Sequence, residues 1–224
     1  ALREIISWGI SSDDLQAKEL ASNLLIICQE YWKVFTERSD DYLALLRIAA
    51  NNSNSLKPSL ELEINLLTGV ELNKRNLTGI FEESIVCLER ALEIAISLDN
   101  SVTIARVAYA LESAYSQSNR DAVKVNEIAK IVNAQVTKRG QIDESTRFYI
   151  SYLNNRSVRL RDSGHPTEAE KYAVESLHQL DDYCRRFPGF RHKHQANEEY
   201  CRIYQNLGRA YKDQGNLEKA KRCF

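Results

Sequence analysis

The chain has 224 residues, with 30 lysines and arginines against 31 aspartates and glutamates and a formal net charge of −1. This balance gives no global attraction to nucleic acid or to an anionic membrane surface. No apolar run approaches the roughly 18 residues of a membrane span, and the first residues do not have the shape of a signal peptide. The sequence therefore predicts a cytoplasmic protein without a membrane or nucleic-acid partner.

Glycine and proline are scarce, at 8 and 3 residues, and 43% of the chain is hydrophobic. This composition is typical of long helices that share a continuous core. The five cysteines are scattered and form no CxxC pair, which predicts reduced, structural side chains. The chain contains no methionine and stops within its last predicted helix. These two features predict a piece of a larger protein, whose other domains would be partners.

The first 55 residues match no known pattern, but they have the periodicity of helices. Residues 13–36 place apolar side chains at helical spacing, with Ser12 or Asp13 as the cap, and residues 40–50 predict a shorter helix. We expect residues 1–55 to form an N-terminal helical cap or adaptor region.

Four aromatic residues lie within the first 36 positions: Trp8, Tyr31, Trp32 and Phe35. One interpretation is that Trp32 and its neighbours pack onto the first hairpin of the array that follows. The alternative is an interface with a partner. An exposed Trp8 would favour the interface, because exposed apolar patches mark interaction surfaces.

From Pro58 onward the sequence predicts antiparallel helical hairpins, which we expect to form an array over residues 56–224. Ser84 and Ala91, in the second helix of the first hairpin, are small enough to let two helices approach closely. The first helices start near residues 58, 101 and 143, so the predicted repeat is about 42 residues long. The expected hairpins span about 58–98, 101–138, 143–187 and 195–224, and the last one is truncated.

The last hairpin carries a motif made by Tyr204, Leu207, Gly208, Tyr211, Ala220 and Phe224. Its spacing resembles that of the tetratricopeptide repeat, W-x2-L-G-x2-Y followed by A-x3-F, with Tyr204 in place of the tryptophan. The preceding hairpin places Ser157 where the motif has glycine. Its other matching residues are Leu153, Leu160, Gly164, Ala169 and Ala173.

The standard tetratricopeptide repeat has about 34 residues. The longer period here resembles kinesin light chain and the sensor arrays of some signalling ATPases. The resemblance implies an all-α fold: a right-handed superhelical array of antiparallel helical hairpins, preceded here by extra N-terminal helices. It also implies that the first helices line a concave groove and that the second helices form the outer face.

No motif for catalysis stands out. The chain has no phosphate-binding glycine loop, no serine-hydrolase or zinc-protease motif and no metal-spaced cysteine and histidine cluster. His192 and His194 flank Lys193, whose charge disfavours a metal. The sequence therefore predicts a non-catalytic protein without a cofactor or metal. A closed polar pocket in place of an open groove would instead indicate an enzyme on a helical-repeat scaffold.

In the tetratricopeptide family, the residues two and five positions after the motif aromatic point into the groove, and these are Asn206 and Arg209 here. An asparagine amide both donates and accepts, so it can grip the backbone of an extended peptide, and basic side chains add affinity for carboxylates. The resemblance therefore implies a surface for an acidic peptide or partner protein. Its candidate residues are Asn155, Arg161, Arg202, Asn206, Arg209 and Lys212. The alternative is that both asparagines are solvated or bridge two helices.

The family's two-carboxylate clamp is matched only in part, because the preceding repeat, near Arg106 and Ala110, supplies no Lys–Asn pair. Residues 185–194 are the most basic stretch. They predict either a docking loop for an anionic partner or, as we favour, an inter-repeat loop in which Phe187 and Phe190 tuck into the core.

These observations predict a protein-interaction scaffold that holds a peptide or partner protein in its concave groove. The alternative is a sensor or oligomerisation arm of a larger signalling protein driven by a nucleotide switch. A glycine-rich phosphate loop upstream of Ala1 would favour that alternative.

Overall fold

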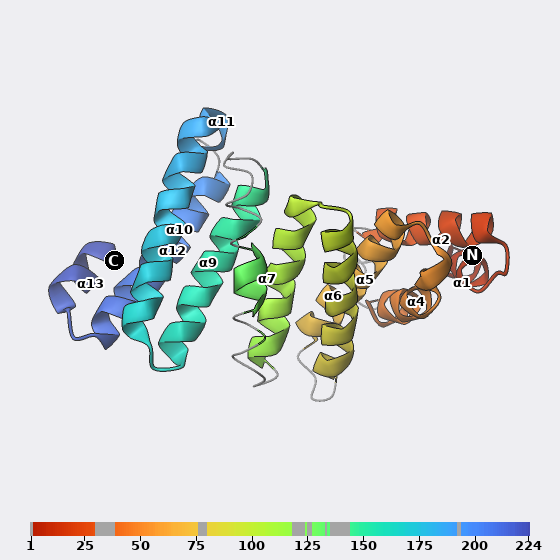
Figure 1. Cartoon of the computed structure of the whole chain (residues 1–224), viewed down its shortest axis with the longest axis horizontal. Helices are drawn as coiled ribbons and strands as arrows, with labels where there is room; N and C mark the ends of the chain where they lie inside the picture. Colours follow the sequence, from red (N-terminus) through yellow and green to blue (C-terminus); the bar gives the residue numbers. More distant parts are fainter. Residues whose placement is uncertain are drawn as a thin grey trace. The chain divides into compact units, whose positions relative to one another are not determined.

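The computed structural model describes residues 2–29, 39–75, 80–117, 124, 127–132, 134, 144–191 and 194–224. These residues form helices joined by short turns, and the described part of the chain contains no strand (Figure 1). The all-α fold class is therefore confirmed. The chain divides into two compact units: residues 1–100 with 117–120, and residues 101–116 with 121–224. The predicted division into a cap over 1–55 and an array over 56–224 stays a prediction.

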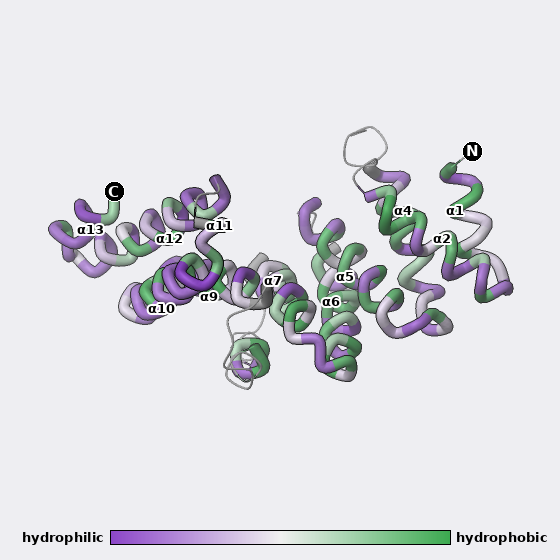
Figure 2. The backbone as a smooth tube through the Cα atoms, turned by 90° about the horizontal axis from the view of Figure 1, so that it is seen from above, coloured by the Kyte–Doolittle hydropathy of each residue, from purple (hydrophilic) through white to green (hydrophobic). Residues whose placement is uncertain are grey.

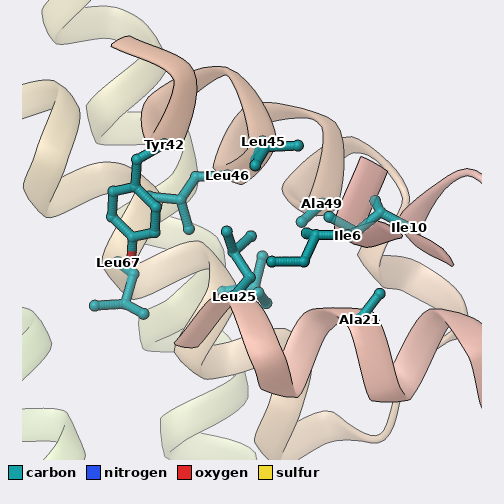
Figure 3. Close-up of a cluster of buried hydrophobic side chains, with 10 residues drawn as sticks. Ile6, Ile10, Ala21, Leu25, Tyr42, Leu45, Leu46, Ala49 and Leu67 are labelled. Atoms are coloured by element: carbon teal, nitrogen blue, oxygen red, sulfur yellow. The ribbon is translucent and has the colours of Figure 1, made fainter. Parts of the chain in front are cut away.

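The first unit packs its N-terminal helices around one apolar cluster. The helices are α1 (Leu2–Ile10), α2 (Leu15–Ile27), α4 (Ser39–Asn51), α5 (Pro58–Lys74) and α6 (Ile80–Ser97), with a 3₁₀ turn at Ser53–Ser55. Figure 3 shows Ile6, Leu25, Leu46 and Leu67 converging from α1, α2, α4 and α5. These side chains are almost completely buried, so the four helices share one core.

The start of α2 differs from the predicted one. Asp14, and neither Ser12 nor Asp13, is the N-cap: its side chain accepts a hydrogen bond from the Gln16 N–H, with 3.0 Å between Oδ1 and N. The Ser12 hydroxyl instead accepts from the Asp14 N–H. The helix ends at Ile27, before the predicted residue 36, and residues 30–38 lie outside the described part of the chain.

Asp14→Ala should destabilise the first unit by about 1 kcal/mol, because the first turn of α2 loses its side-chain acceptor. Asp13→Ala is the matched control. Urea denaturation followed by tryptophan fluorescence measures both, since Trp8 and Trp32 belong to the first unit. Equal effects of the two substitutions would contradict the assignment of the cap.

Helices α5 and α6 approach closely through two small residues. The Ser84 hydroxyl donates to the Gly69 carbonyl oxygen at 2.7 Å, and Ser84, Leu88 and Ala91 are all fully buried. A Cβ on Gly69 would lie 2.4 Å from Leu88 Cγ. The close approach predicted for Ser84 and Ala91 is therefore present.

The second unit contains α7 (Ser101–Gln117), α9 (Glu144–Asp162), α10 (Pro166–Arg186), α11 (Pro188–Arg191), α12 (His194–Asp213) and α13 (Leu217–Cys223). Helix α7 starts where the predicted 101–138 hairpin does, and the pairs α9–α10 and α12–α13 begin and end within one residue of the predicted 143–187 and 195–224. The second half of the predicted 101–138 hairpin falls largely outside the described residues. The short helix α11 has no counterpart in the sequence prediction.

Two turns of the second unit are built alike. Gly164 and Gly215 end α9 and α12 with φ of 81° and 79°, a backbone conformation that favours glycine. The residue after each glycine donates its N–H to a carbonyl five residues earlier, His165 to Leu160 and Asn216 to Tyr211, both at 2.8 Å. These positions are the ones aligned by the sequence motif, so the two hairpins repeat at the level of the turn.

Figure 2 shows hydrophobic residues prominent along α4, α5 and α6, and polar residues prominent along α10 and α12. In α12 the buried apolar residues Ala196, Ile203, Leu207 and Ala210 share one face. The opposite face of α12 is therefore polar, and it carries several of the candidate site residues.

Candidate functional site

Helices α9 and α12 contact each other in the second unit, and three polar pairs join them along their length. Arg147 Nη2 lies 3.4 Å from Gln195 Oε1. Asn206 Nδ2 donates to Asn154 Oδ1 at 2.9 Å, and Arg161 Nε lies 3.9 Å from Asp213 Oδ2. We call these three pairs the α9–α12 seam. Its α9 members are seven residues apart, which is about two turns, so they lie on one stripe of the helix.

The amide of Asn206 bridges the two helices. It is half-buried, and its partner Asn154 is buried. This is the helix-bridging role that the sequence left open for Asn206. The sequence reasoning named Asn155, which is half-buried, and missed its neighbour Asn154. The sequence contained a signal that Asn154 faces another helix, because this residue lies between Ile150 and Ser157 on the buried stripe of α9.

Arg161 also belongs to the seam. It is half-buried, and it donates to Asp162 at 2.6 Å in addition to pairing with Asp213. A rotation of about 100° per residue places Arg161 about 120° around α9 from Asn155. The structure therefore does not bring these two candidate residues onto one stripe.

The remaining candidates, Arg202, Arg209 and Lys212, are exposed on α12. Between residues 202 and 212 this helix carries these three basic residues and no acidic one. Arg202 and Arg209 are seven residues apart and share a stripe, and Lys212 lies about 80° around the helix from Arg202. Arg202 Nη1 lies 3.5 Å from Glu199 Oε1, and the Arg202 side chain is 61% exposed. Such a surface pair contributes little free energy, so Arg202 is available to a ligand.

Residues 202–224 match the family model of the tetratricopeptide repeat. The chain contains a tetratricopeptide repeat. Together with the helical hairpins of the described residues, this match supports a relationship to the tetratricopeptide-repeat superfamily. The match covers one hairpin, so the 42-residue period stays a prediction. No curated protein matches the chain.

A tetratricopeptide repeat indicates a protein-interaction scaffold and is generally non-catalytic. In the described ranges, no helix combines the length and the apolar character that crossing a bilayer requires. No group of three or more His, Cys, Asp or Glu side chains among the described residues is placed to hold a metal ion.

The sequence reasoning missed a buried ionic cluster in the second unit. Glu112 of α7 is fully buried, and its Oε1 lies 3.5 Å from Arg156 Nη1 and 3.2 Å from Arg159 Nη1 of α9. The Arg156 guanidinium also stacks over the Tyr172 ring, 5.1 Å from its centroid. The cluster links α7 to α9 and leaves two positive charges around one carboxyl group.

Burial raises the pKa of the Glu112 carboxyl above its ordinary value, although Arg159 and Arg156 act in the opposite direction. Burial lowers the pKa of Arg159. Glu112 follows Leu111 within the apolar stripe of α7. This position within the stripe was the signal in the sequence for the burial of Glu112.

The basic stretch around α11 is only partly as predicted. Phe190 is buried, and its ring meets the Tyr183 ring edge-on at 5.1 Å. Phe187 lies against Tyr183 at 4.7 Å but remains 39% exposed, so the expectation that both phenylalanines tuck into the core is wrong for Phe187. Position 187 follows the last residue of α10, at the surface end of that helix. His192 and Lys193 lie outside the described residues.

Two of the hollows lined by described residues lie in the second unit. The larger, about 250 Å³, is lined by His178, Asp181, Cys184, Arg185 and Tyr200. The Tyr200 hydroxyl donates to Asp181 Oδ1 at 2.5 Å, and burial raises the pKa of Tyr200. His178 and Arg185 are 71% and 72% exposed, so this hollow is open to solvent. The smaller hollow, about 120 Å³, lies beside the seam at Arg147.

The first unit exposes the aromatic residue that the sequence reasoning singled out. Trp8 is 69% exposed, and Ile5, one turn earlier on α1, is 57% exposed. This exposure favours a partner surface for Trp8 over packing as a cap. Tyr31, Trp32 and Phe35 lie outside the described residues.

Proposed function

We propose that the second unit binds an acidic, extended segment of a partner protein along the α9–α12 seam. The observation that carries this proposal is the row of exposed basic side chains, Arg202, Arg209 and Lys212, on the helix that the seam holds against α9. The tetratricopeptide repeat at residues 202–224 includes this row.

The chemistry of the seam suits a peptide backbone flanked by carboxylates. Asn155 is half-buried beside the seam, and its amide offers both a donor and an acceptor. Asn206 uses one N–H on Asn154 and keeps its oxygen and second N–H for a ligand. Arg202 contacts Glu199 through one guanidinium nitrogen, so its other N–H donors can bind a carboxylate of the partner.

Arg161 has a different role in this proposal. Two aspartates, Asp162 and Asp213, neutralise it at the end of the seam. We therefore assign Arg161 to holding α12 in place, and Arg202, Arg209 and Lys212 to contacting the partner.

The test is selection of binders from a phage-displayed random peptide library, followed by measurement of Kd by fluorescence anisotropy. We expect acidic peptides to be enriched. Arg202→Glu with Arg209→Glu should weaken their binding by about tenfold or more, because charge-assisted hydrogen bonds are lost. The matched control is Lys171→Glu with Arg186→Glu, which reverses the same number of exposed charges on α10. Equal affinity of wild type and the α12 variant would refute the proposal.

The sensor or oligomerisation arm stays a prediction of the sequence. The described residues supply no observation that favours it over peptide binding.

A further inference from the structure

The smaller hollow of the second unit lies where α9, α10, α11 and α12 meet. It has a volume of about 120 Å³. Its apolar wall is made by Phe148, which is half-buried, and by Ile150, Leu180 and Phe190, which are buried. Its polar rim is made by Arg147, Ser151 and Glu199. Apolar walls with a few polar groups at the mouth are typical of pockets that bind a ligand.

The wall residue Phe190 is held firmly. Its ring contacts the Tyr183 ring edge-on, the Arg147 guanidinium lies 5.0 Å from its centroid, and its N–H donates to the Phe187 carbonyl at 2.9 Å. Phe190 comes from α11, the short helix between the last two hairpins. The short helix that separates these hairpins therefore supplies one wall of the hollow.

The position of the hollow connects it to the proposed peptide path. Ser151 lies one turn before Asn155 on α9, and Glu199 at the rim contacts Arg202 of the basic row. Arg147 at the rim is also the first member of the seam. A peptide that lies along the seam would pass over the mouth of this hollow.

The charges at the rim favour an anionic ligand. Among the described residues, the polar partner that the structure gives Arg147 is the neutral amide of Gln195, so most of its five N–H donors remain for a carboxylate. The carboxylate at the rim, Glu199, is already next to Arg202.

We propose that this hollow is an anchor pocket for one aliphatic side chain of the acidic segment, and that Arg147 binds a carboxylate next to that side chain. This inference rests on the proposed function. A cavity of about 150 Å³ with similar walls holds benzene. A hollow of about 120 Å³ therefore suits valine, leucine or isoleucine and is too small for the indole of tryptophan.

The experiment uses fluorescein-labelled peptides in which acidic residues flank one variable residue: glycine, alanine, valine, leucine or tryptophan. We expect affinity to rise from glycine to leucine by about tenfold to a hundredfold, since a buried leucine side chain gains that much, and to fall again for tryptophan. Ser151→Phe, which fills the mouth of the hollow, should lower the affinity for the leucine peptide to the affinity for the glycine peptide. Val174→Phe, at an exposed position of α10, is the matched control. Arg147→Gln should weaken all peptides alike and keep the ratio of leucine to glycine.

The outcomes separate the two proposals. If all five peptides bind equally well, and Arg202→Glu with Arg209→Glu abolishes that binding, the anchor pocket is wrong and the seam remains. If no peptide binds, both proposals are overturned. The comparison of the five peptides needs only the wild-type protein, so it tests the anchor pocket even if Ser151→Phe does not fold.

Discussion

Glu112→Gln should cost the second unit about 3–5 kcal/mol of unfolding free energy, because it removes one partner of a buried ionic cluster. The substitution keeps the shape of the side chain but leaves Arg156 and Arg159 without their shared counter-charge. Both arginines are largely buried, so water can compensate only in part. Urea denaturation at pH 8, followed by far-UV circular dichroism, measures the cost.

Two controls make this measurement specific. Glu218→Gln changes an exposed glutamate of α13 and should alter the free energy by no more than about 0.5 kcal/mol. Glu112→Gln combined with Arg159→Gln should cost less than the sum of the two single changes, because the second substitution removes an unneutralised charge. A cost of Glu112→Gln below about 1 kcal/mol would contradict the role of Glu112 as the shared counter-charge of the two arginines.

Gly69→Leu should destabilise the first unit by about 3 kcal/mol, at the upper end of the cost of overpacking a core. The new Cβ would lie 2.4 Å from Leu88 Cγ and 3.0 Å from the Ser84 carbonyl oxygen. Leu88 is fully buried and the carbonyl belongs to a helix, so α5 and α6 must separate. Thermal unfolding followed by the fluorescence of Trp8 and Trp32 reports this unit.

Gly208 provides the comparison within the same chain. A Cβ there would lie 2.8 Å from Phe224 Cζ and 3.1 Å from Cys223 Cβ. Phe224 is 72% exposed and can turn away, so Gly208→Leu should cost about 1 kcal/mol, the low end of the same range. If the melting temperature did not move on Gly208→Leu, the motif register would be wrong. If Gly208→Leu lowered the free energy of unfolding more than Gly69→Leu does, the close packing described for α5 and α6 would be wrong.

Sequence reasoning located the helices of the second unit well because strong local signals mark their ends. Gly164 and Gly215 stand at left-handed turns, and Pro166 opens α10. These signals act within a few residues, so they do not depend on the tertiary structure. The short helix α11 has no such marker, because the Pro-Gly pair that begins it is equally typical of a plain turn.

The site was harder to predict because it depends on which helix face is covered. Asn154 and Asn155 are adjacent in sequence, but one meets α12 and the other lies beside the seam. A family pattern places a residue to within about one position, which on a helix is about 100° of rotation. Glu112 was missed for another reason: glutamate is almost never fully buried without a partner, and its arginines come from a helix more than forty residues away.

The spacing of the three α9–α12 contacts also fixes how these helices are aligned. A slip of α12 by one turn, about 5.4 Å, would set Arg161 against Arg209 and Asn154 against Arg202, in place of the aspartate and asparagine that they meet now. Like charges in contact oppose such a slip. A partner would therefore meet a template whose register is set before it arrives, and association would proceed without the delay of a rearrangement.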